Sequence, residues 1–189
     1  MTLAGSLDAL VERYLNAFPR LTTQFDPAWR SQAERGEAFG EAGSGEQRIQ
    51  WQPTLREPCN DFAGLERALE TPIHPDIVDY YGRYWGQNLE CTSREGHVSL
   101  ILLWNQEDID RLIENLIGHS LSQKRSRSPF SIFFANTEPD SDYFLSVQNT
   151  SGRVVLERPG RKPVREVAPT LAAFLARLDP ADSPDPQLY

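Results

Sequence analysis

The residue types most often used in catalysis and metal binding are sparse and widely spaced in this 189-residue chain. The three histidines, His74, His97 and His119, are separated by 23 and 22 residues, far from the three- to five-residue spacing of a zinc site. The two cysteines, Cys59 and Cys91, do not form a CxxC pair. We therefore expect no metal site and no cofactor.

Catalytic patterns are also missing from the sequence. Glu114 and His119 are five residues apart, about 140° around a helix, and so would not share a face. His119 is better explained as a capping or packing residue near a helix end. There is no GxSxG elbow, no GxxxxGK[ST] phosphate loop and no GxGxxG motif after a strand. Pairs of carboxylates suited to glycoside hydrolysis are expected by chance in an acidic chain. We predict no catalytic residues and no enzymatic activity.

The distribution of charge is more informative. The formal net charge is −8, and residues 57–114 alone carry twelve acidic and four basic residues. The acids are Glu57, Asp61, Glu66, Glu70, Asp76, Asp79, Glu90, Glu95, Glu107, Asp108, Asp110 and Glu114. Such a region attracts basic surfaces and repels nucleic acids and anionic lipids. An ordinary solvated face would have the same composition, so both interpretations stay open.

Two basic clusters lie outside the acidic region: Lys124, Arg125 and Arg127, and then Arg158, Arg161, Lys162 and Arg165. Either cluster could contact phosphates or lipid head groups. The first would also stabilise the C-terminal end of a helix. Because the sequence pI is about 4.9, nucleic-acid binding is not expected. Membrane association is expected to be indirect, through a protein partner.

Hydrophobic periodicity predicts an alternation of helices and strands. In the first half we expect a helix over 3–18, a polar mobile loop over 30–47 and a short strand over 49–52. Asp61 is expected to cap a helix that carries Phe62, Leu65 and Leu69. A further helix is predicted from Pro75 to Tyr84. Four aromatic residues of this half, Trp51, Tyr80, Tyr81 and Trp85, are expected in the core rather than at a contact surface.

The second half is predicted to form most of a sheet. We expect strands over 89–93 and 98–104, then a helix capped by Asn105. The buried stripe of that helix is expected to contain Ile109, Leu112, Ile113, Leu116, Ile117 and Leu121. Strands over 130–136, 143–148 and 153–157 follow, then a last helix from Pro169. The proline-rich end, including residues 181–189, is expected to be a loose tail.

Length and composition predict one domain, over residues 1–180, in a reducing compartment. No apolar run approaches the roughly 20 residues that span a bilayer. No basic region followed by an apolar stretch is visible at the N-terminus, so the cytosol is expected.

Several short motifs together resemble the Syd family. They are Trp51-Gln52-Pro53, Leu65-Glu66-Arg67-Ala68, Trp104 with Glu107-Asp108, Glu114-Asn115-Leu116-Ile117-Gly118-His119, Gln123-Lys124-Arg125 and Asn149-Thr150-Ser151-Gly152. The resemblance implies a single α/β (α+β) domain of the SUKH type, with a mixed, mostly antiparallel sheet flanked by helices. It also implies a peripheral protein on the cytosolic face of the bacterial inner membrane. Its partner would be SecY, a subunit of the protein translocon, whose basic cytosolic loops would meet a concave acidic groove.

Acidic residues that lie in the matching motifs are the first candidates for this contact: Glu66, Glu107, Asp108 and Glu114. Asp76, Asp79 and Glu90 are neighbouring candidates. Binding is expected to monitor or regulate translocon assembly, and a monomer is favoured. An alternative is an immunity-type protein that neutralises a basic toxin through the same acidic face. Composition alone does not separate these two functions.

Overall fold

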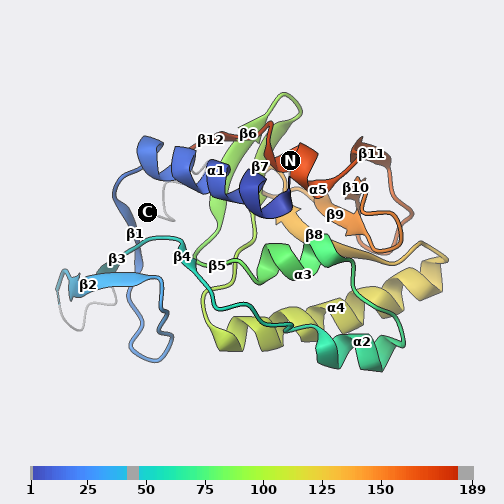
Figure 1. Ribbon diagram of the computed structural model, residues 1–189, viewed down its shortest axis with the longest axis horizontal. Coiled ribbons are helices and arrows are strands. Elements are labelled where there is room, and N and C mark those ends of the chain that lie inside the picture. The colour runs from blue at the N-terminus through green and yellow to red at the C-terminus, as the bar shows by residue number, and fades with distance from the viewer. Residues whose placement is uncertain (1, 42–46, 183–189) are drawn as a thin grey trace.

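The computed structural model describes residues 2–41 and 47–182, which form five helices and twelve strands (Figure 1). The helices are α1 (Leu3–Ala17), α2 (Ala63–Leu69), α3 (Pro75–Tyr81), α4 (Gln106–Ser126) and α5 (Leu171–Leu175). The first seven strands are β1 (Leu21–Gln24), β2 (Glu34–Phe39), β3 (Arg48–Trp51), β4 (Thr54–Leu55), β5 (Tyr84–Trp85), β6 (Leu89–Ser93) and β7 (Gly96–Leu100). The others are β8 (Ser131–Asn136), β9 (Phe144–Gln148), β10 (Val154–Glu157), β11 (Arg165–Ala168) and β12 (Asp179–Pro180).

Seven strands form the main sheet, in the order β11-β10-β9-β8-β7-β6-β12, and all of their pairings are antiparallel. A separate small sheet has the order β1-β3-β2, and β4 pairs with β5. The chain is thus a single mixed α/β domain with a mostly antiparallel sheet, as the sequence predicted.

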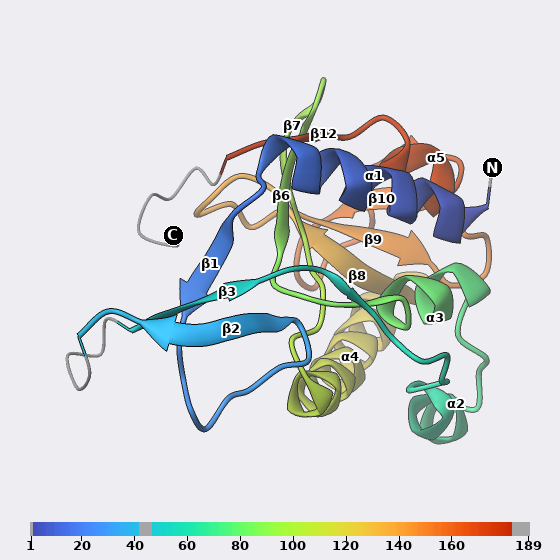
Figure 2. The same cartoon turned by 60° about the vertical axis from the view of Figure 1, so that its left-hand side comes forward.

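The main sheet is covered on both faces, because side chains alternate along each strand. On β8, Phe134 packs against Phe174 of α5, with ring centroids 5.7 Å apart. Its neighbour Phe133 points the other way and packs against His119 of α4, at 5.8 Å. Figure 2 shows the result: α1 and α5 lie on one side of the sheet and α4 lies on the other. A helix on each side gives the domain one continuous core.

Helix α3 supplies a hydrogen bond to the main sheet at the point where β7 and β8 separate. Strands β7 and β8 pair only at Ser99–Asn136 and Leu100–Ala135, which leaves carbonyl groups of β8 without a strand partner. The Tyr81 hydroxyl donates to the Phe133 carbonyl at 2.8 Å, and the Ile101 amide donates to the Phe134 carbonyl at 2.9 Å. Buried carbonyls need such partners. The four aromatic residues assigned to the core from the sequence are indeed buried.

Helix α4 is capped at both ends, which fixes the side chains that it carries. The Asn105 side chain accepts from the Asp108 amide at 3.1 Å, as predicted. At the other end Arg127 adopts a left-handed conformation, with φ of 53°. The buried positions are Ile109, Leu112, Leu116, Ser120 and Gln123.

Several expectations for individual elements were wrong. Ile117 and Leu121 of α4 are not buried but 38% and 49% exposed. Asp61 does not cap α2, because its carboxylate binds Arg56 instead. The expected loop over 30–47 contains β2, although residues 42–46 lie outside the described part.

Other boundaries also differ from those predicted. The predicted helix from Pro75 ends at Tyr81, and the predicted strand over 98–104 is β7, which ends at Leu100. Strand β12 pairs with β6 at the start of the expected tail, while residues 183–189 lie outside the described part. Strands β1, β4, β5 and β11 were not predicted.

Candidate functional site

The exposed side of α4 carries three acidic side chains in its first half. Glu107, Asp110 and Glu114 are all exposed, and their spacing of three and four residues places them on one face of the helix. Within the described residues, none of the three forms an ion pair or a side-chain hydrogen bond. We call Glu107, Asp110 and Glu114 the acidic face of α4. Asp110 is one of the twelve acids of residues 57–114, but it was not among the predicted contact residues.

Asp108, another predicted contact residue, has a structural role at the start of the same helix. Its carboxylate accepts from the Trp104 amide at 2.9 Å, and its own amide donates to Asn105. These bonds satisfy amides at the helix start that would otherwise lack partners. Asp108 therefore helps to position the acidic face.

Glu66 also binds within the protein. One carboxylate oxygen accepts from the Ile73 amide at 2.9 Å, and the other accepts from the Asn60 side-chain amide at 3.2 Å. Glu66 thus ties α2 to the segment that leads into α3.

Glu90 is the most buried of the predicted contact residues, with 9% of its surface exposed. Its carboxylate lies 2.7 Å from His97 Nε2 and accepts from the Ser99 hydroxyl at 2.8 Å. Both partners lie on β7, so Glu90 joins two neighbouring strands.

The remaining two predicted residues, Asp76 and Asp79, lie on α3. Asp76 is half-buried in the first turn, and Asp79 is exposed beside a hollow of about 220 Å³ that Arg56 and Arg83 also line. Both guanidinium groups are paired with other carboxylates, Arg56 with Asp61 and Arg83 with Asp8. Of the seven predicted residues, α4 brings together Glu107, Asp108 and Glu114, and α3 brings together Asp76 and Asp79. Glu66 and Glu90 lie on separate elements.

A hollow of about 460 Å³ lies between α4 and the main sheet. The helix contributes Asn115, Gly118, His119 and Ser122, the sheet contributes Phe133 and Phe144, and the loop after β10 contributes Pro159 and Gly160. The His119 ring packs edge-to-face on Phe133 and Phe144, with centroids 5.8 and 5.7 Å away. This confirms the packing role expected for His119.

Behind His119 lies a buried carboxylate that the sequence analysis did not identify. Glu157 is 1% exposed, accepts from the Ser131 hydroxyl at 2.6 Å, and lies 3.9 Å from His119 Nε2. Burial raises the pKa of Glu157 and lowers that of His119, because desolvation disfavours both charged forms. No sequence signal marks Glu157, which ends an otherwise apolar strand. The pair supports the wall of the hollow rather than adding to the acidic surface.

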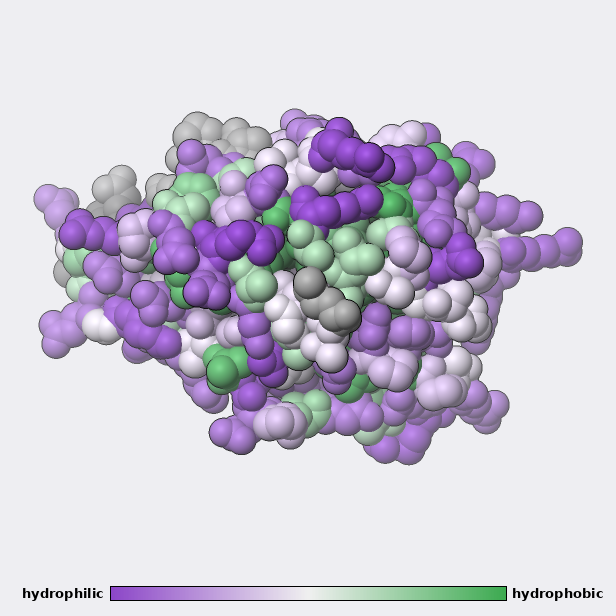
Figure 3. All heavy atoms as spheres, turned by 45° about the horizontal axis from the view of Figure 1, so that its top comes forward, coloured by the Kyte–Doolittle hydropathy of each residue, from purple (hydrophilic) through white to green (hydrophobic). Residues whose placement is uncertain are grey.

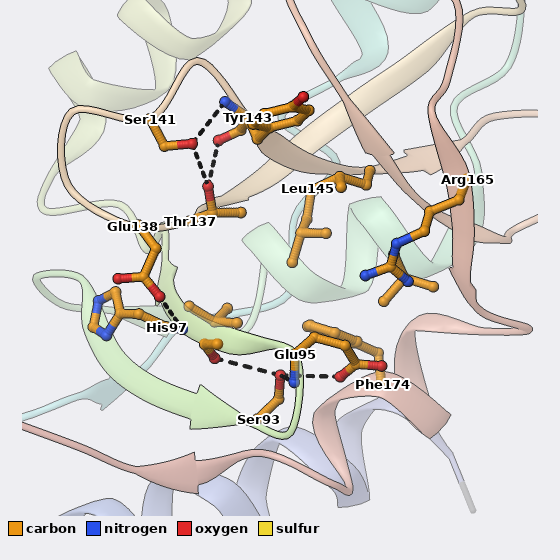
Figure 4. A pocket seen from close by; sticks show the side chains of 14 residues that line it. Ser93, Glu95, His97, Thr137, Glu138, Ser141, Tyr143, Leu145, Arg165 and Phe174 are labelled. Carbon is orange, nitrogen blue, oxygen red and sulfur yellow. Dashed lines mark hydrogen bonds between the residues drawn. The ribbon is translucent and has the colours of Figure 1, made fainter.

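A second hollow, of about 200 Å³, lies at the other side of the sheet between the β6–β7 turn and β11 (Figure 4). Its floor is apolar, with Leu145 and Phe174, and Arg165 points into it. Glu138 accepts from the His97 amide at 2.8 Å on its rim. None of the seven predicted contact residues lines this hollow.

Both cysteines are free, and neither is set up as a nucleophile. Burial raises the pKa of Cys91 to about 12. A hydrogen bond to the Asp61 carboxylate raises the pKa of Cys59. Since the thiolate is the reactive form, both pKa shifts disfavour reaction of these thiols at neutral pH.

Within residues 2–41 and 47–182, no three or more His, Cys, Asp and Glu side chains are grouped so that they could hold a metal ion. No helix of the described chain is long and apolar enough to cross a membrane. The face of the molecule that includes α1 is mostly hydrophilic, with only small apolar areas (Figure 3).

The chain is similar to a family of known bacterial proteins. The family model described as Syd protein (SUKH-2) matches residues 4–180. A protein named Protein Syd from Pseudoalteromonas atlantica is 38% identical over 157 residues, which cover 83% of this chain and 82% of that protein. Protein Syd from Hahella chejuensis is 40% identical over 134 residues, covering 71% and 69%. Protein Syd from Alteromonas mediterranea is 31% identical over 185 residues, covering 97% and 99%.

Proposed function

The chain belongs to the Syd (SUKH-2) family, and on that premise we propose that it is a non-enzymatic protein that docks on SecY through its acidic surface. The contacts would be basic cytosolic loops of SecY, and docking would monitor or regulate translocon assembly. The protein would then be peripheral to the cytosolic face of the inner membrane and held there by its protein partner.

The observation that carries this proposal is the acidic face of α4. Three like charges on neighbouring turns repel one another, at a cost of a few tenths of a kcal/mol per pair. Glu107 offsets part of this cost, because a carboxylate near the N-terminus of a helix is favourable. Glu114 lies in the middle of the helix, where the dipole gives it no such benefit. Its charge is explained by a basic partner rather than by the stability of the helix.

The nature of the target supports the same conclusion. Cytosolic loops of membrane proteins carry an excess of Lys and Arg. Carboxylates that are exposed and free of internal partners can steer such loops into contact and bind them with little desolvation. We therefore assign direct contact to Glu107, Asp110 and Glu114, with Asp76 and Asp79 at the edge of the surface. Glu66, Asp108 and Glu90 would act by holding their elements in place.

The hollow between α4 and the main sheet, which Asn115 lines, gives the proposed surface its concave part. Its aromatic floor of Phe133 and Phe144 would receive the aliphatic part of a basic side chain whose charged end reaches the acidic face. The arrangement needs no reaction at the site. The groups beside the hollow do not favour chemistry: desolvation lowers the pKa of His119, whose ring packs against Phe133 and Phe144.

Binding of the purified protein to detergent-solubilised SecY tests this proposal. We expect specific recovery of SecY at low ionic strength, with at least a tenfold loss of affinity between about 50 and 300 mM salt, because salt screens exposed charges. Absence of detectable binding to SecY at every salt concentration, including the lowest, would contradict the proposal. If the protein instead recovers a small basic toxin, and no SecY, from a detergent-solubilised cell lysate, the immunity-type alternative would be favoured.

A further inference from the structure

The exposed side of α4 continues beyond the acidic face as a regular stripe. Six exposed residues repeat at alternating steps of three and four: Glu107, Asp110, Glu114, Ile117, Leu121 and Lys124. This is the spacing of the contact positions in a coiled coil. The stripe is separate from the buried side of the helix, which faces the main sheet. It therefore has the pattern of an interface but no partner within the described chain.

Charge along the stripe is strongly polarised. Its N-terminal half is acidic, its centre consists of Ile117 and Leu121, and its C-terminal end is basic, with Lys124 and the adjacent Arg125. A second copy of the same helix in parallel orientation would place acids against acids. A copy in antiparallel orientation would place Glu114 against the basic end of the other helix and leave Glu107 and Asp110 beyond that end, since α4 ends at Ser126. This arrangement is its own complement under a two-fold axis.

We propose that two copies of this protein associate through antiparallel contact of their α4 helices. With the two-fold axis near position 119, Ile117 of each chain packs against Leu121 of the other. In the same register Glu114 of each chain faces Lys124 of the other. The contact goes beyond the proposed SecY docking and can be measured without SecY.

The surroundings of α4 are compatible with this contact. Figures 1 and 2 both place α4 on the lower side of the molecule, together with α2 and away from α1 and α5. The positive charge of Arg111 could offset the negative charge of the acids on the stripe. Its guanidinium group instead stacks on Trp29, with its central carbon 4.0 Å from the ring centroid. The helix is also preorganised, because both of its ends are capped.

The association should be weak. Ile117 and Leu121 are only 38% and 49% exposed, so each chain buries little apolar area. Small interfaces of this kind are typical of transient complexes, with dissociation constants of about 10 µM to 1 mM. Because Glu114 belongs both to this contact and to the acidic face, a paired molecule would be unable to dock on SecY. Self-association would then compete with SecY binding: the paired form would be unable to dock, and SecY would bind the single chains that dissociate from it.

Sedimentation velocity over protein concentrations of about 10 µM to 1 mM tests the proposal. For the wild type we expect a reversible increase in average mass from one chain, 21.4 kDa, toward two. Leu121→Glu should weaken the association by at least about tenfold, because it places a charge at the apolar centre. Leu55→Glu makes the same change at a site on β4 that is 59% exposed, and it should have no effect.

Charge exchange gives a second, independent test. Glu114→Lys and Lys124→Glu should each weaken self-association, since each puts like charges opposite each other, and the double variant should restore it. A wild type that stays monomeric throughout would overturn the proposal. So would an association that Leu121→Glu leaves unchanged, or one that the double exchange does not restore. The double variant keeps Lys at position 114, so it should still be impaired in docking on SecY, which separates the two proposals.

Discussion

Reversing all three charges of the acidic face, as Glu107→Lys, Asp110→Lys and Glu114→Lys, should reduce binding to SecY-containing membranes by about 100-fold. Each reversal replaces an attraction to a basic loop by a repulsion, which we take as about 1 kcal/mol at an exposed site. Three such changes amount to about 3 kcal/mol, or roughly two powers of ten in affinity. The measurement is co-sedimentation with membranes that contain or lack SecY.

A matched variant separates a local contact from a general effect of charge. Glu12, Glu37 and Glu57 are exposed acids on α1, on β2 and in the segment before α2. Changing these three to Lys alters the net charge by the same amount, and binding should fall by less than about threefold. Equal losses for the two triple variants would refute the assignment of contact to α4. Because Lys at position 107 is unfavourable at a helix start, circular dichroism must show that helix content is kept.

Asp61→Ala should lower the free energy of unfolding by about 3 kcal/mol, far more than the loss of a helix cap. The Asp61 carboxylate lies 2.7 Å from Arg56, and the two side chains are only 9% and 3% exposed. Arg56 also donates to the Tyr81 carbonyl at 2.6 Å and stacks over Trp85 at 3.9 Å. Removing the carboxylate leaves a buried cation without its counter-charge, which is strongly destabilising.

Asn60→Ala is the control for that experiment. The Asn60 side chain accepts from the Phe62 amide at 3.0 Å, the kind of local bond that Asp61 was expected to make, and it also donates to Glu66 in an exposed hydrogen bond of 3.2 Å. Its loss should cost about 1 kcal/mol. The comparison is made by urea denaturation of both variants and the wild type. Equal destabilisation by the two substitutions would show that the ion pair with Arg56 contributes no more than a cap.

The sequence was most informative where a buried face has a regular period. Leu3, Leu7 and Leu10 predicted α1, and the apolar run around Val98 predicted a strand inside the sheet. It was least informative where strands are short and polar. Strands β1 and β2 read Leu-Thr-Thr-Gln and Glu-Arg-Gly-Glu-Ala-Phe, and neither shows an alternation of apolar and polar residues. These strands are defined by pairing with β3, which is a tertiary contact.

Helix α4 illustrates why side-chain type did not identify the buried face. Gln123 is 4% exposed because its side chain donates to the Ser131 hydroxyl at 2.6 Å and accepts from the Ser131 amide at 3.1 Å. Leu121, two residues earlier, points to solvent. A polar residue with two partners in the sheet can be buried at low cost, whereas hydropathy assigns it to the surface.

At the candidate site, too, the residue types did not show which side chains already have partners within the protein. The sequence located the excess of negative charge, but it did not show which carboxylates are already bound. Glu66 and Glu90 accept hydrogen bonds from backbone or neighbouring strands, while Glu114 does not. The distinction depends on two contacts that the fold creates. Ile73, seven residues after Glu66, lies in the segment before α3, and Ser99, nine residues after Glu90, lies on β7.

The most direct test of the acidic face as the docking surface is site-specific photo-crosslinking in membranes that contain SecY. A photoreactive amino acid at position 115 would replace an exposed asparagine beside Glu114 on α4. The matched control is position 16, an exposed asparagine on α1 at the other side of the sheet. We predict adducts with SecY from position 115 that salt suppresses, and none from position 16. Adducts of equal yield from both positions, or from position 16 alone, would contradict the account.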